Sequence, residues 1–328
     1  MKTGIHSLAG AAAAVLLGVS VSSAQAPPNV VQRTELHPIR SVTLSDSQFL
    51  KGDETGGTPV TVAGQLRIPR GEGRIPVVFL IHGSSGPGAN IDIWSDQFTE
   101  MGVATFVLDG FTGRGLTSVS ANQALLGRLN LIVDAYRGLA ILAKHPRVDP
   151  SRIVVMGFSR GGQATLYSSL ERFNRMWNKS GIQFAAHIPL YPDCSTTYVE
   201  DTDVDRPIRI FHGAADDYTP VSKCRTFVER LRTAGRDVQL TEYPDAPHTF
   251  DNPLGSQPPV VNPNSQSVRA CTIREEPLGQ LINAVTKQPF TYTDPCVERG
   301  PHTGYHPAAA KAARQAVGEY LKSVFKLP

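Results

Sequence analysis

The chain has 328 residues, 41% of them hydrophobic, and a formal net charge of +3 at pH 7. This length fits one large domain, and the hydrophobic content is enough for a substantial core. The near-neutral charge balance, without a long basic run, excludes nucleic acid as an expected partner.

The first 26 residues have the pattern of a secretory signal peptide. Lys2 precedes a run of Ala, Leu, Val and Gly that ends in a small-x-small cleavage pattern at residues 24–26. The alternative is a membrane anchor, but the apolar run is short and rich in small residues. We expect cleavage near Ala26, secretion or export to the periplasm, no stable membrane anchor, and a single domain over 27–328.

The first half of the mature chain contains several apolar runs. Residues 27 to about 50 are mixed in composition and are expected to form a surface arm. Alternation over 60–69 predicts an antiparallel strand. The apolar runs 75–83 and 103–110 predict strands buried on both faces, with a helix over 93–102 between them. Apolar residues at spacings of three and four predict a helix over 125–143.

The second half continues the alternation of strands and helices. Strands are predicted at 152–157, 182–192, 207–213 and 237–244, and helices at 161–173, 222–235 and 307–325. Residues 251–305 are rich in Pro, Asn, Gln and Thr, and we expect an irregular insertion there. The alternation predicts an α/β fold with a mainly parallel central sheet and helices on both faces.

The stretch GFSRG, residues 157–161, places Ser159 between glycines directly after a predicted strand. It is either an ordinary strand-to-helix turn or a nucleophile elbow, the Gly-x-Ser-x-Gly turn that exposes a catalytic serine. Asp216 and His248 follow two later predicted strands. Their order of serine, acid and histidine is that of the α/β-hydrolase triad, and all three fall at the same edge of the predicted sheet.

These residue types suit acyl transfer. A serine hydroxyl becomes a good nucleophile when His248 takes its proton, and Asp216 would fix the histidine tautomer. The oxyanion that forms needs donors already in place. We expect the backbone N–H groups of Arg160 and Ser84, with Ser85 as the alternative to Ser84.

Other polar residues have competing interpretations. Asp217 competes with Asp216 for the role of the acid, and Asp193 is a more distant alternative. Three histidines are expected to be structural: His82, His212 and His187. A metal site at His302 and His306 is a remote alternative, so we expect neither a metal nor a cofactor.

The segments LIHGSSG, VLDGFTGRG, VVMGFSRGG, FHGAADDYTP and YPDAPHTF resemble the dienelactone hydrolase family of α/β-hydrolases. They span residues 75 to 250. Typical members use a cysteine nucleophile where this chain has Ser159, so it resembles a secreted serine branch. The resemblance implies hydrolysis of a small-molecule ester or lactone without a cofactor. A peptidase or acyltransferase, or an inactive binding protein on the same fold, are the alternatives, and no protein partner is inferred.

Arg114 and Arg160 could each face a substrate carboxylate, although pairing with local acids is the favoured interpretation. The four cysteines suggest two disulfides in an exported protein. The predicted pairs are Cys194–Cys224, on loops after consecutive strands, and Cys271–Cys296, within the insertion. Reduced thiols and crossed pairing are the alternatives.

Overall fold

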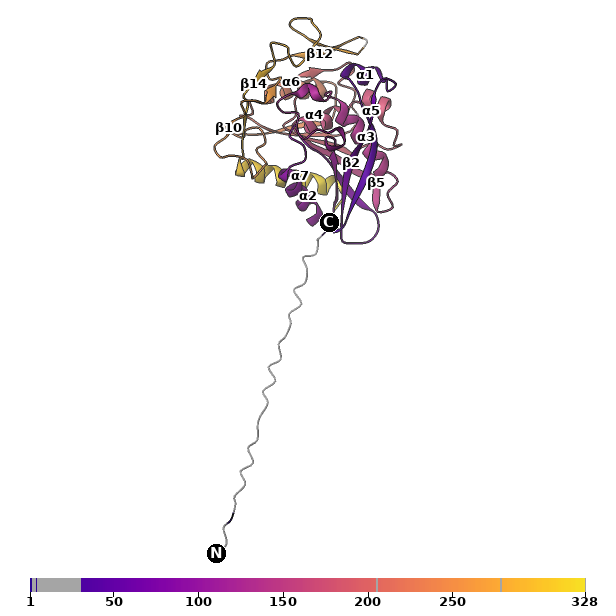
Figure 1. Ribbon diagram of the computed structural model, residues 1–328, viewed down its shortest axis with the longest axis vertical. Helices are drawn as coiled ribbons and strands as arrows, with labels where there is room; N and C mark the ends of the chain where they lie inside the picture. The colour runs from indigo at the N-terminus through magenta and orange to yellow at the C-terminus, as the bar shows by residue number, and fades with distance from the viewer. Residues whose placement is uncertain (2–3, 5–30, 205, 278, 328) are drawn as a thin grey trace.

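A computed structural model describes Met1, Gly4 and residues 31–204, 206–277 and 279–327 (Figure 1). The expected signal peptide lies outside the described residues, apart from Met1 and Gly4. No described helix is both long and apolar enough to cross a membrane.

One eight-stranded sheet forms the centre of the molecule, with the strand order β1-β2-β4-β3-β5-β6-β8-β9. Strands β1 and β2 pair antiparallel, as do β2 and β4, and the remaining neighbours are parallel. This architecture confirms the predicted α/β class. The strands are β1 (Val31–Thr43), β2 (Thr58–Pro69), β3 (Ile75–Ile81), β4 (Ala104–Asp109), β5 (Val148–Phe158), β6 (Ala186–Leu190), β8 (Ile208–Gly213) and β9 (Val238–Tyr243).

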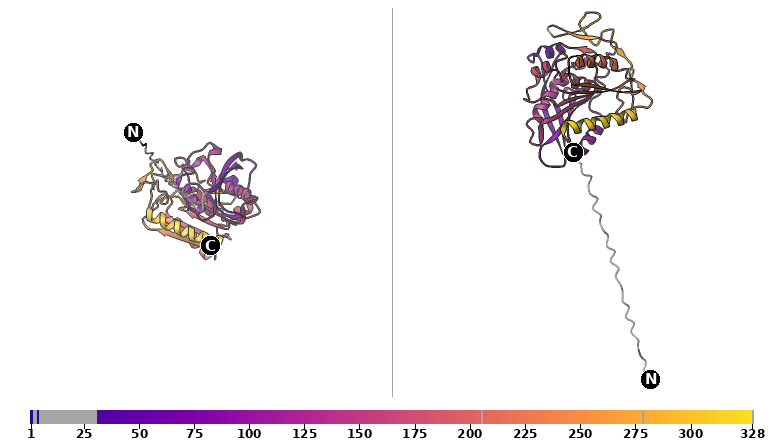
Figure 2. Two further views of the ribbon diagram at one scale, coloured as in Figure 1. Left: turned by 90° about the horizontal axis from the view of Figure 1, so that it is seen from below. Right: turned by 180° about the vertical axis from the view of Figure 1, so that it is seen from behind.

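Helices cover both faces of the sheet. Along β3, Val78 and Leu80 pack in the core shared with α2 (Ala89–Glu100) and α7 (Pro307–Phe325), which lie side by side in Figures 1 and 2. The alternate residues of β3, Phe79 and Ile81, belong to the second core. The period of two along a strand explains this division. The second core contains residues of α1 (Asp46–Lys51), α3 (Asn130–Leu142), α4 (Arg160–Tyr167), α5 (Glu171–Trp177) and α6 (Val221–Thr233).

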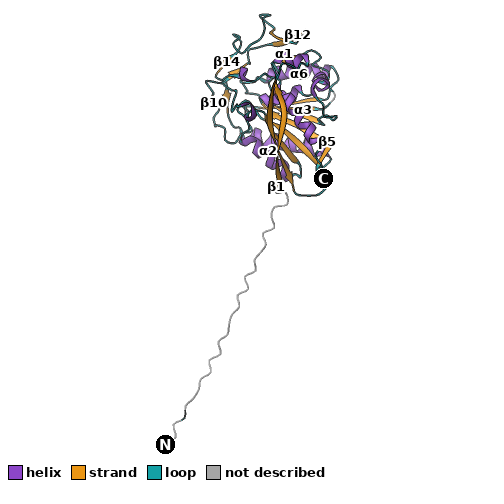
Figure 3. Ribbon diagram, turned by 45° about the vertical axis from the view of Figure 1, so that its right-hand side comes forward, coloured by secondary structure: helices purple, strands orange, loops and turns teal. Residues whose placement is uncertain are grey.

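The expected N-terminal arm is wrong. Residues 31–43 form β1, a long strand at the edge of the sheet that is prominent in Figure 3, and α1 follows it. Sequence analysis missed this strand because none of its first eight residues is buried, so they do not alternate cleanly between apolar and polar. Its Pro38 is tolerated because an edge strand needs only one side of its ladder.

The insertion is more regular than expected. Its short strands form small antiparallel pairs, and β12 also pairs in parallel with β7 (Thr196–Thr197). Composition hides such strands because their stability comes from contacts with the main domain. These strands are β10 (Val260–Val261), β11 (Gln266–Ser267), β12 (Ile273–Glu276), β13 (Gln280–Asn283), β14 (Glu298–Arg299) and β15 (His302–Thr303).

The four cysteines lie in two pairs at disulfide distance. Cys194 is bonded to Cys224, and Cys271 to Cys296. The first pair connects the loop after β6 to the first turns of α6, and the second lies inside the insertion. This is the pairing expected from the sequence.

Candidate active site

Ser159 lies in a tight turn between β5 and α4. Its backbone has φ 53° and ψ −112°, a region that non-glycine residues rarely occupy. The glycines on either side are required by crowding. A Cβ at Gly157 would lie 2.2 Å from the carbonyl oxygen of Gly161, and one at Gly161 would lie 2.1 Å from that of Ile81. Gly157 and Gly161 therefore let a strand and a helix meet at a strained serine.

His248 connects the serine to an aspartate. Its Nε2 lies 2.9 Å from Ser159 Oγ, and its Nδ1 lies 2.7 Å from Asp216 Oδ2. The other carboxylate oxygen of Asp216 accepts hydrogen bonds from the backbone N–H groups of Tyr218 and Thr219 at 2.8 and 2.9 Å. These contacts fix the carboxylate so that one oxygen is directed at the imidazole.

The environment keeps Asp216 ionised. Burial favours the neutral acid, but the charge and hydrogen bond of His248, the charge of His212 and the Thr219 N–H together outweigh burial and lower the pKa of Asp216 below its ordinary value. The ionised Asp216 accepts a hydrogen bond from the Nδ1–H of His248. With its proton on Nδ1, the imidazole has its lone pair on Nε2, which faces the serine.

The two competing acids point elsewhere. Asp217 accepts hydrogen bonds from the backbone and the ring of His302, both at 2.8 Å, and from Arg269 at 3.2 Å. Asp193 pairs with Arg128 at 2.7 Å. Of the three candidate acids, Asp216 alone contacts His248.

The two backbone N–H groups that we expect to form an oxyanion hole belong to residues beside Ser159, one in the chain and one in space. Arg160 is the first residue of α4, and Ser84 follows Gly83 at the end of β3. A Cβ on Gly83 would lie 3.3 Å from the Phe158 carbonyl and 3.5 Å from the Ser159 Cβ, so this loop lies against the serine. Neither N–H donates to a described acceptor outside the regular helices and strands. The first N–H groups of a helix have no intrahelical acceptor.

Gln123 joins these two residues through its side chain. Its Oε1 accepts from the guanidinium of Arg160 at 2.6 Å, and its Nε2 donates to Ser84 Oγ at 3.1 Å. The backbone N–H of Gln123 donates to Gln266 of the insertion at 2.8 Å. Sequence analysis missed Gln123, because it lies in an irregular segment around the 3₁₀ helix η2 (Gln123–Leu125) and carries no motif.

Two cavities meet at Ser159. The smaller has a volume of about 40 Å³, and its wall includes the two buried arginines Arg128 and Arg160. The larger has a volume of about 250 Å³, and its wall includes His248. Ser84, Ser159 and Tyr218 border both cavities, and residues of the insertion border each of them.

The suggestion that Arg114 contacts substrate is not supported. The side chain of Arg114 is buried and pairs with Asp134 through two contacts of 2.7 and 3.0 Å, and it also donates to the Gly110 carbonyl. It borders neither of the two cavities at Ser159. Its five donors are used to connect the loop after β4 with β1 and α3. Arg160 differs, because it borders the smaller cavity and donates to Gln123 and to the carbonyls of Leu126 and Gly127 rather than to a carboxylate.

The histidines expected to be structural are buried and hydrogen-bonded. His82 Nδ1 contacts the Gly83 carbonyl at 2.8 Å, and its Nε2 accepts from the Gly110 N–H at 3.1 Å. Burial lowers the pKa of His82 to about 4, so the ring is neutral at pH 7. Burial also lowers the pKa of His212. His187 is enclosed beneath α4, where its Nδ1 lies 3.0 Å from the Thr165 carbonyl.

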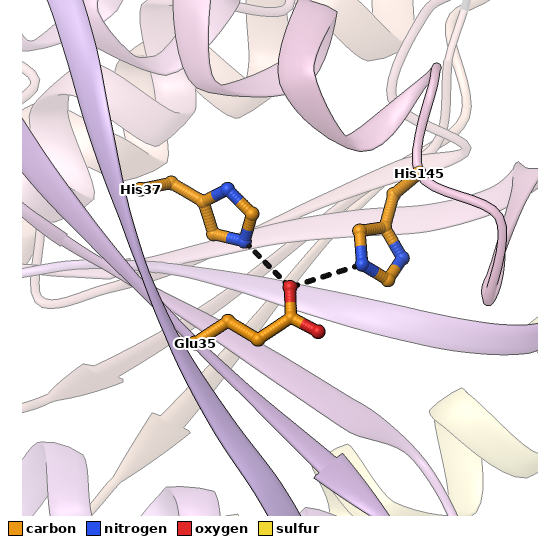
Figure 4. A group of neighbouring side chains, drawn as sticks. All are labelled: Glu35, His37 and His145. Carbon is orange, nitrogen blue, oxygen red and sulfur yellow. Dashed lines mark hydrogen bonds and ion pairs between the residues drawn. The ribbon is translucent and has the colours of Figure 1, made fainter.

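The residues suggested for a remote metal site do not gather. His302 pairs with Asp217, and His306 caps the N-terminus of α7. Among the described residues, one group of possible metal ligands has its ligand atoms within 4.8 Å of one another, and it lies elsewhere: Glu35, His37 and His145. Figure 4 shows one oxygen of Glu35 between the two imidazole rings.

Hydrogen bonding accounts for this group. Nε2 of His37 and Nε2 of His145 lie 3.0 and 3.1 Å from the same Glu35 oxygen. The backbone N–H of Arg147 donates to Nδ1 of His145 at 3.2 Å. A neutral His145 therefore carries its proton on Nε2, so the lone pair that a metal would need is absent. The arrangement fits a carboxylate that connects β1 to the turn after α3.

Residues 62–325 match the dienelactone hydrolase family. The chain belongs to this family. Membership identifies the protein as a hydrolase, and the expected family and fold are both confirmed. Two solved structures agree in fold: a dienelactone hydrolase-like promiscuous phosphotriesterase from metagenomic libraries (TM-score 0.56, 14% identity) and a protein named m3DLH (TM-score 0.57, 18% identity). Each alignment covers 89% of this chain and 99% of the other.

Curated relatives of this family member match a smaller part of the chain. Acyl-protein thioesterase 1 of Gibberella zeae is 31% identical over 102 residues, which cover 30% of this chain and 42% of the relative. A probable dipeptidyl-aminopeptidase B of Aspergillus niger is 24% identical over 211 residues, which cover 54% of this chain and 23% of the relative. The chain thus spans less than half the length of these relatives.

Proposed function

We propose that this protein hydrolyses carboxylic esters or lactones through an acyl-serine intermediate, with Ser159, His248 and Asp216 as the triad. One observation carries the proposal: a single imidazole lies within hydrogen-bond distance of both a strained serine hydroxyl and a buried, ionised carboxylate. Family membership supports the same chemistry.

Each step has a residue in position. Ser159 Oγ attacks the ester carbonyl carbon as its proton passes to His248 Nε2. The carbonyl oxygen becomes an oxyanion held by the Ser84 and Arg160 N–H groups, each worth about 3–4 kcal/mol of transition-state stabilisation. The C–O bond to the alcohol then breaks, and His248 returns the proton to the departing oxygen. A water molecule, activated by the same histidine, releases the acid and restores Ser159.

The two cavities separate the acyl group from the alcohol. The departing oxygen must lie near His248, which borders the larger cavity, so the acyl group belongs in the smaller one. A volume of about 40 Å³ corresponds to roughly three water molecules. The proposed substrates therefore carry a short acyl group.

A peptidase with the same triad is the second candidate, because the match to dipeptidyl-aminopeptidases covers 54% of the chain. Relative rates on matched ester and amide substrates separate the two candidates. An inactive binding protein would have no reactive serine. Labelling with a fluorophosphonate, which reacts with activated serines, tests this directly: we expect labelling of the wild type and none of Ser159→Ala.

Two further assignments belong to the same proposal. Export after cleavage near Ala26 is supported by the two cysteine pairs at disulfide distance. Residues 251–305 act as a cap within one domain of 27–328, supported by their place in the walls of both cavities. Chain-end sequencing of the exported protein tests the first, and the activity of cap variants on esters of increasing acyl length tests the second.

A further inference from the structure

The larger cavity has a wall chemistry that identifies the alcohol half of the substrate. We propose that it binds a neutral alcohol with several hydroxyl groups, such as a sugar ring, so that the substrate is a sugar carrying a short ester. This assignment rests on the proposed function, because it assumes that His248 gives its proton to the departing alcohol.

Most side chains of this wall are those of Ser, Thr and Asn, and the others are the aromatic rings of Phe158, Tyr191, Tyr218 and His248. They come from two directions: the loops after β3 and β4 on one side, and the residues after His248 on the other. Both walls supply groups that can donate and accept hydrogen bonds, as hydroxyl ligands require. The Ser, Thr and Asn side chains are Ser84, Ser85, Asn90, Ser120, Ser159, Thr249, Asn252, Asn262, Ser265 and Thr303.

The wall is equally defined by the residue types that it lacks. Among its described residues, no Asp, Glu, Lys or Arg is present, and no aliphatic side chain. A charged alcohol would therefore be buried without a counter-ion, which is costly. An alkyl alcohol would remove water from hydroxyls and amides without replacing their hydrogen bonds, which is unfavourable for each group left unpaired.

The wall has hydrogen-bonding capacity to spare. The side-chain nitrogen of Asn262 donates to Thr303 Oγ1 at 2.7 Å, while its side-chain oxygen has no partner among the described residues. At the opposite wall, Ser85 Oγ lies 3.3 Å from Ser120 Oγ, which is at the long end of hydrogen-bond distance. Tyr218 adds a half-buried aromatic ring beside His248, on which the apolar face of a sugar ring can pack.

The volume is compatible with such a group. The larger cavity, about 250 Å³, is several times the volume of the smaller one. The unequal pair favours a substrate with a small acid and a bulky alcohol. Sugar esters of short acids have this asymmetry, whereas fatty-acid esters of small alcohols have the reverse.

A matched pair of esters tests the assignment. Methyl 6-O-acetyl-glucopyranoside and cyclohexylmethyl acetate are both acetates of a primary alcohol on a six-membered ring, and only the first carries ring hydroxyls. We expect kcat/KM to be about 100-fold higher for the sugar ester, because a site built to bind hydroxyls discriminates strongly against an analogue that lacks them.

Variants connect that preference to the cavity. Asn262→Leu should reduce the sugar-to-cyclohexyl ratio of kcat/KM about tenfold. Asn264→Leu, an exposed position in the same loop that does not border the cavity, is the control and should leave the ratio unchanged. Ser120→Ala removes one oxygen atom at the opposite wall and serves if Asn262→Leu does not fold.

The outcomes distinguish the two proposals. A folded protein that hydrolyses neither acetate nor p-nitrophenyl acetate, and is not labelled at Ser159, overturns both. Hydrolysis of p-nitrophenyl acetate with equal kcat/KM for the two ring esters, or with preference for the cyclohexyl ester, overturns the sugar assignment alone. A preference for the sugar ester that Asn262→Leu and Ser120→Ala both leave intact also overturns it.

Discussion

Two adjacent aspartates allow a stringent test of the triad. Asp216→Asn and Asp217→Asn make the same chemical change one residue apart, in the same turn after β8. Asp216 contacts His248 at 2.7 Å, whereas Asp217 contacts His302 and Arg269 on the far side of the turn. We expect the first substitution to abolish most activity and the second to have little effect on it.

The size of the first effect follows from the hydrogen bonds. In Asp216→Asn, the oxygen of the new amide would accept from the backbone N–H groups that Asp216 Oδ1 now binds, so the amide NH₂ would face His248 Nδ1. A donor at that place favours the tautomer with the proton on Nε2, which cannot accept a proton from Ser159. The expected loss in kcat is about 10⁴-fold. The Asp217 carboxylate is substantially exposed, and loss of its ion pairs costs about 1 kcal/mol or less in stability.

The assay is steady-state hydrolysis of p-nitrophenyl acetate by both variants, with circular dichroism to show that each is folded. A loss of activity in Asp217→Asn that equals or exceeds the loss in Asp216→Asn would refute the assignment of the acid. A tenfold or smaller loss in folded Asp216→Asn would show that the aspartate does not set the histidine tautomer.

Four further predictions concern other parts of the site and its support. Ser159→Ala should reduce kcat about 10⁴–10⁶-fold with an unchanged melting temperature, and retention of a tenth of the activity would contradict the mechanism. Burial lowers the pKa of His82 from 6.5 to about 4, so its contribution to the free energy of unfolding is present above pH 6.5 and is lost as the pH falls toward 4, by about 3 kcal/mol in total. Urea denaturation at pH 7 and pH 4.5 should therefore show that the free energy of unfolding of His82→Asn depends less on pH than that of the wild type. Replacing Cys194 and Cys224 by alanine opens a loop of 30 residues and should lower the free energy of unfolding by about 3–4 kcal/mol, measured by urea titration. Gln123→Met should lower kcat about 10–100-fold with KM within about threefold, and a change in KM alone would show that Gln123 acts on binding.

The parallel part of the sheet was predictable because its strands are buried on both faces. The runs at 75–83 and 103–110 are continuous in apolar residues, and β3 is buried along its whole length. The candidate site followed from these strands, since their carboxyl ends define one edge. Ser159, Asp216 and His248 were placed together from the Gly-x-Ser-x-Gly pattern, their chain order and their positions after predicted strands, and their side chains meet there.

Residues whose partners come from distant segments were harder to predict. The edge strand β1 is stabilised by its pairing with β2, not by a pattern of its own. Gln123 contacts partners 37, 39 and 143 positions away. Arg114 follows a strand at the active edge, yet its orientation depends on the buried Asp134 of α3, which no local pattern reveals. Chain order locates a residue at an edge, whereas tertiary contacts decide where its side chain points.

The insertion is physically part of the sheet edge that carries the candidate site, and the two aspartates show how. The backbone of His248 forms a parallel bridge with Thr303, and its carbonyl accepts from the Gly304 N–H at 3.1 Å. Asp217 binds the neighbouring His302, while Asp216 binds the imidazole. One turn therefore uses one carboxylate to orient the histidine side chain and the next to hold the segment that supports the histidine backbone. A displacement of the insertion would move the wall of the larger cavity and the proposed base together, so substrate recognition and proton transfer share the same structural support.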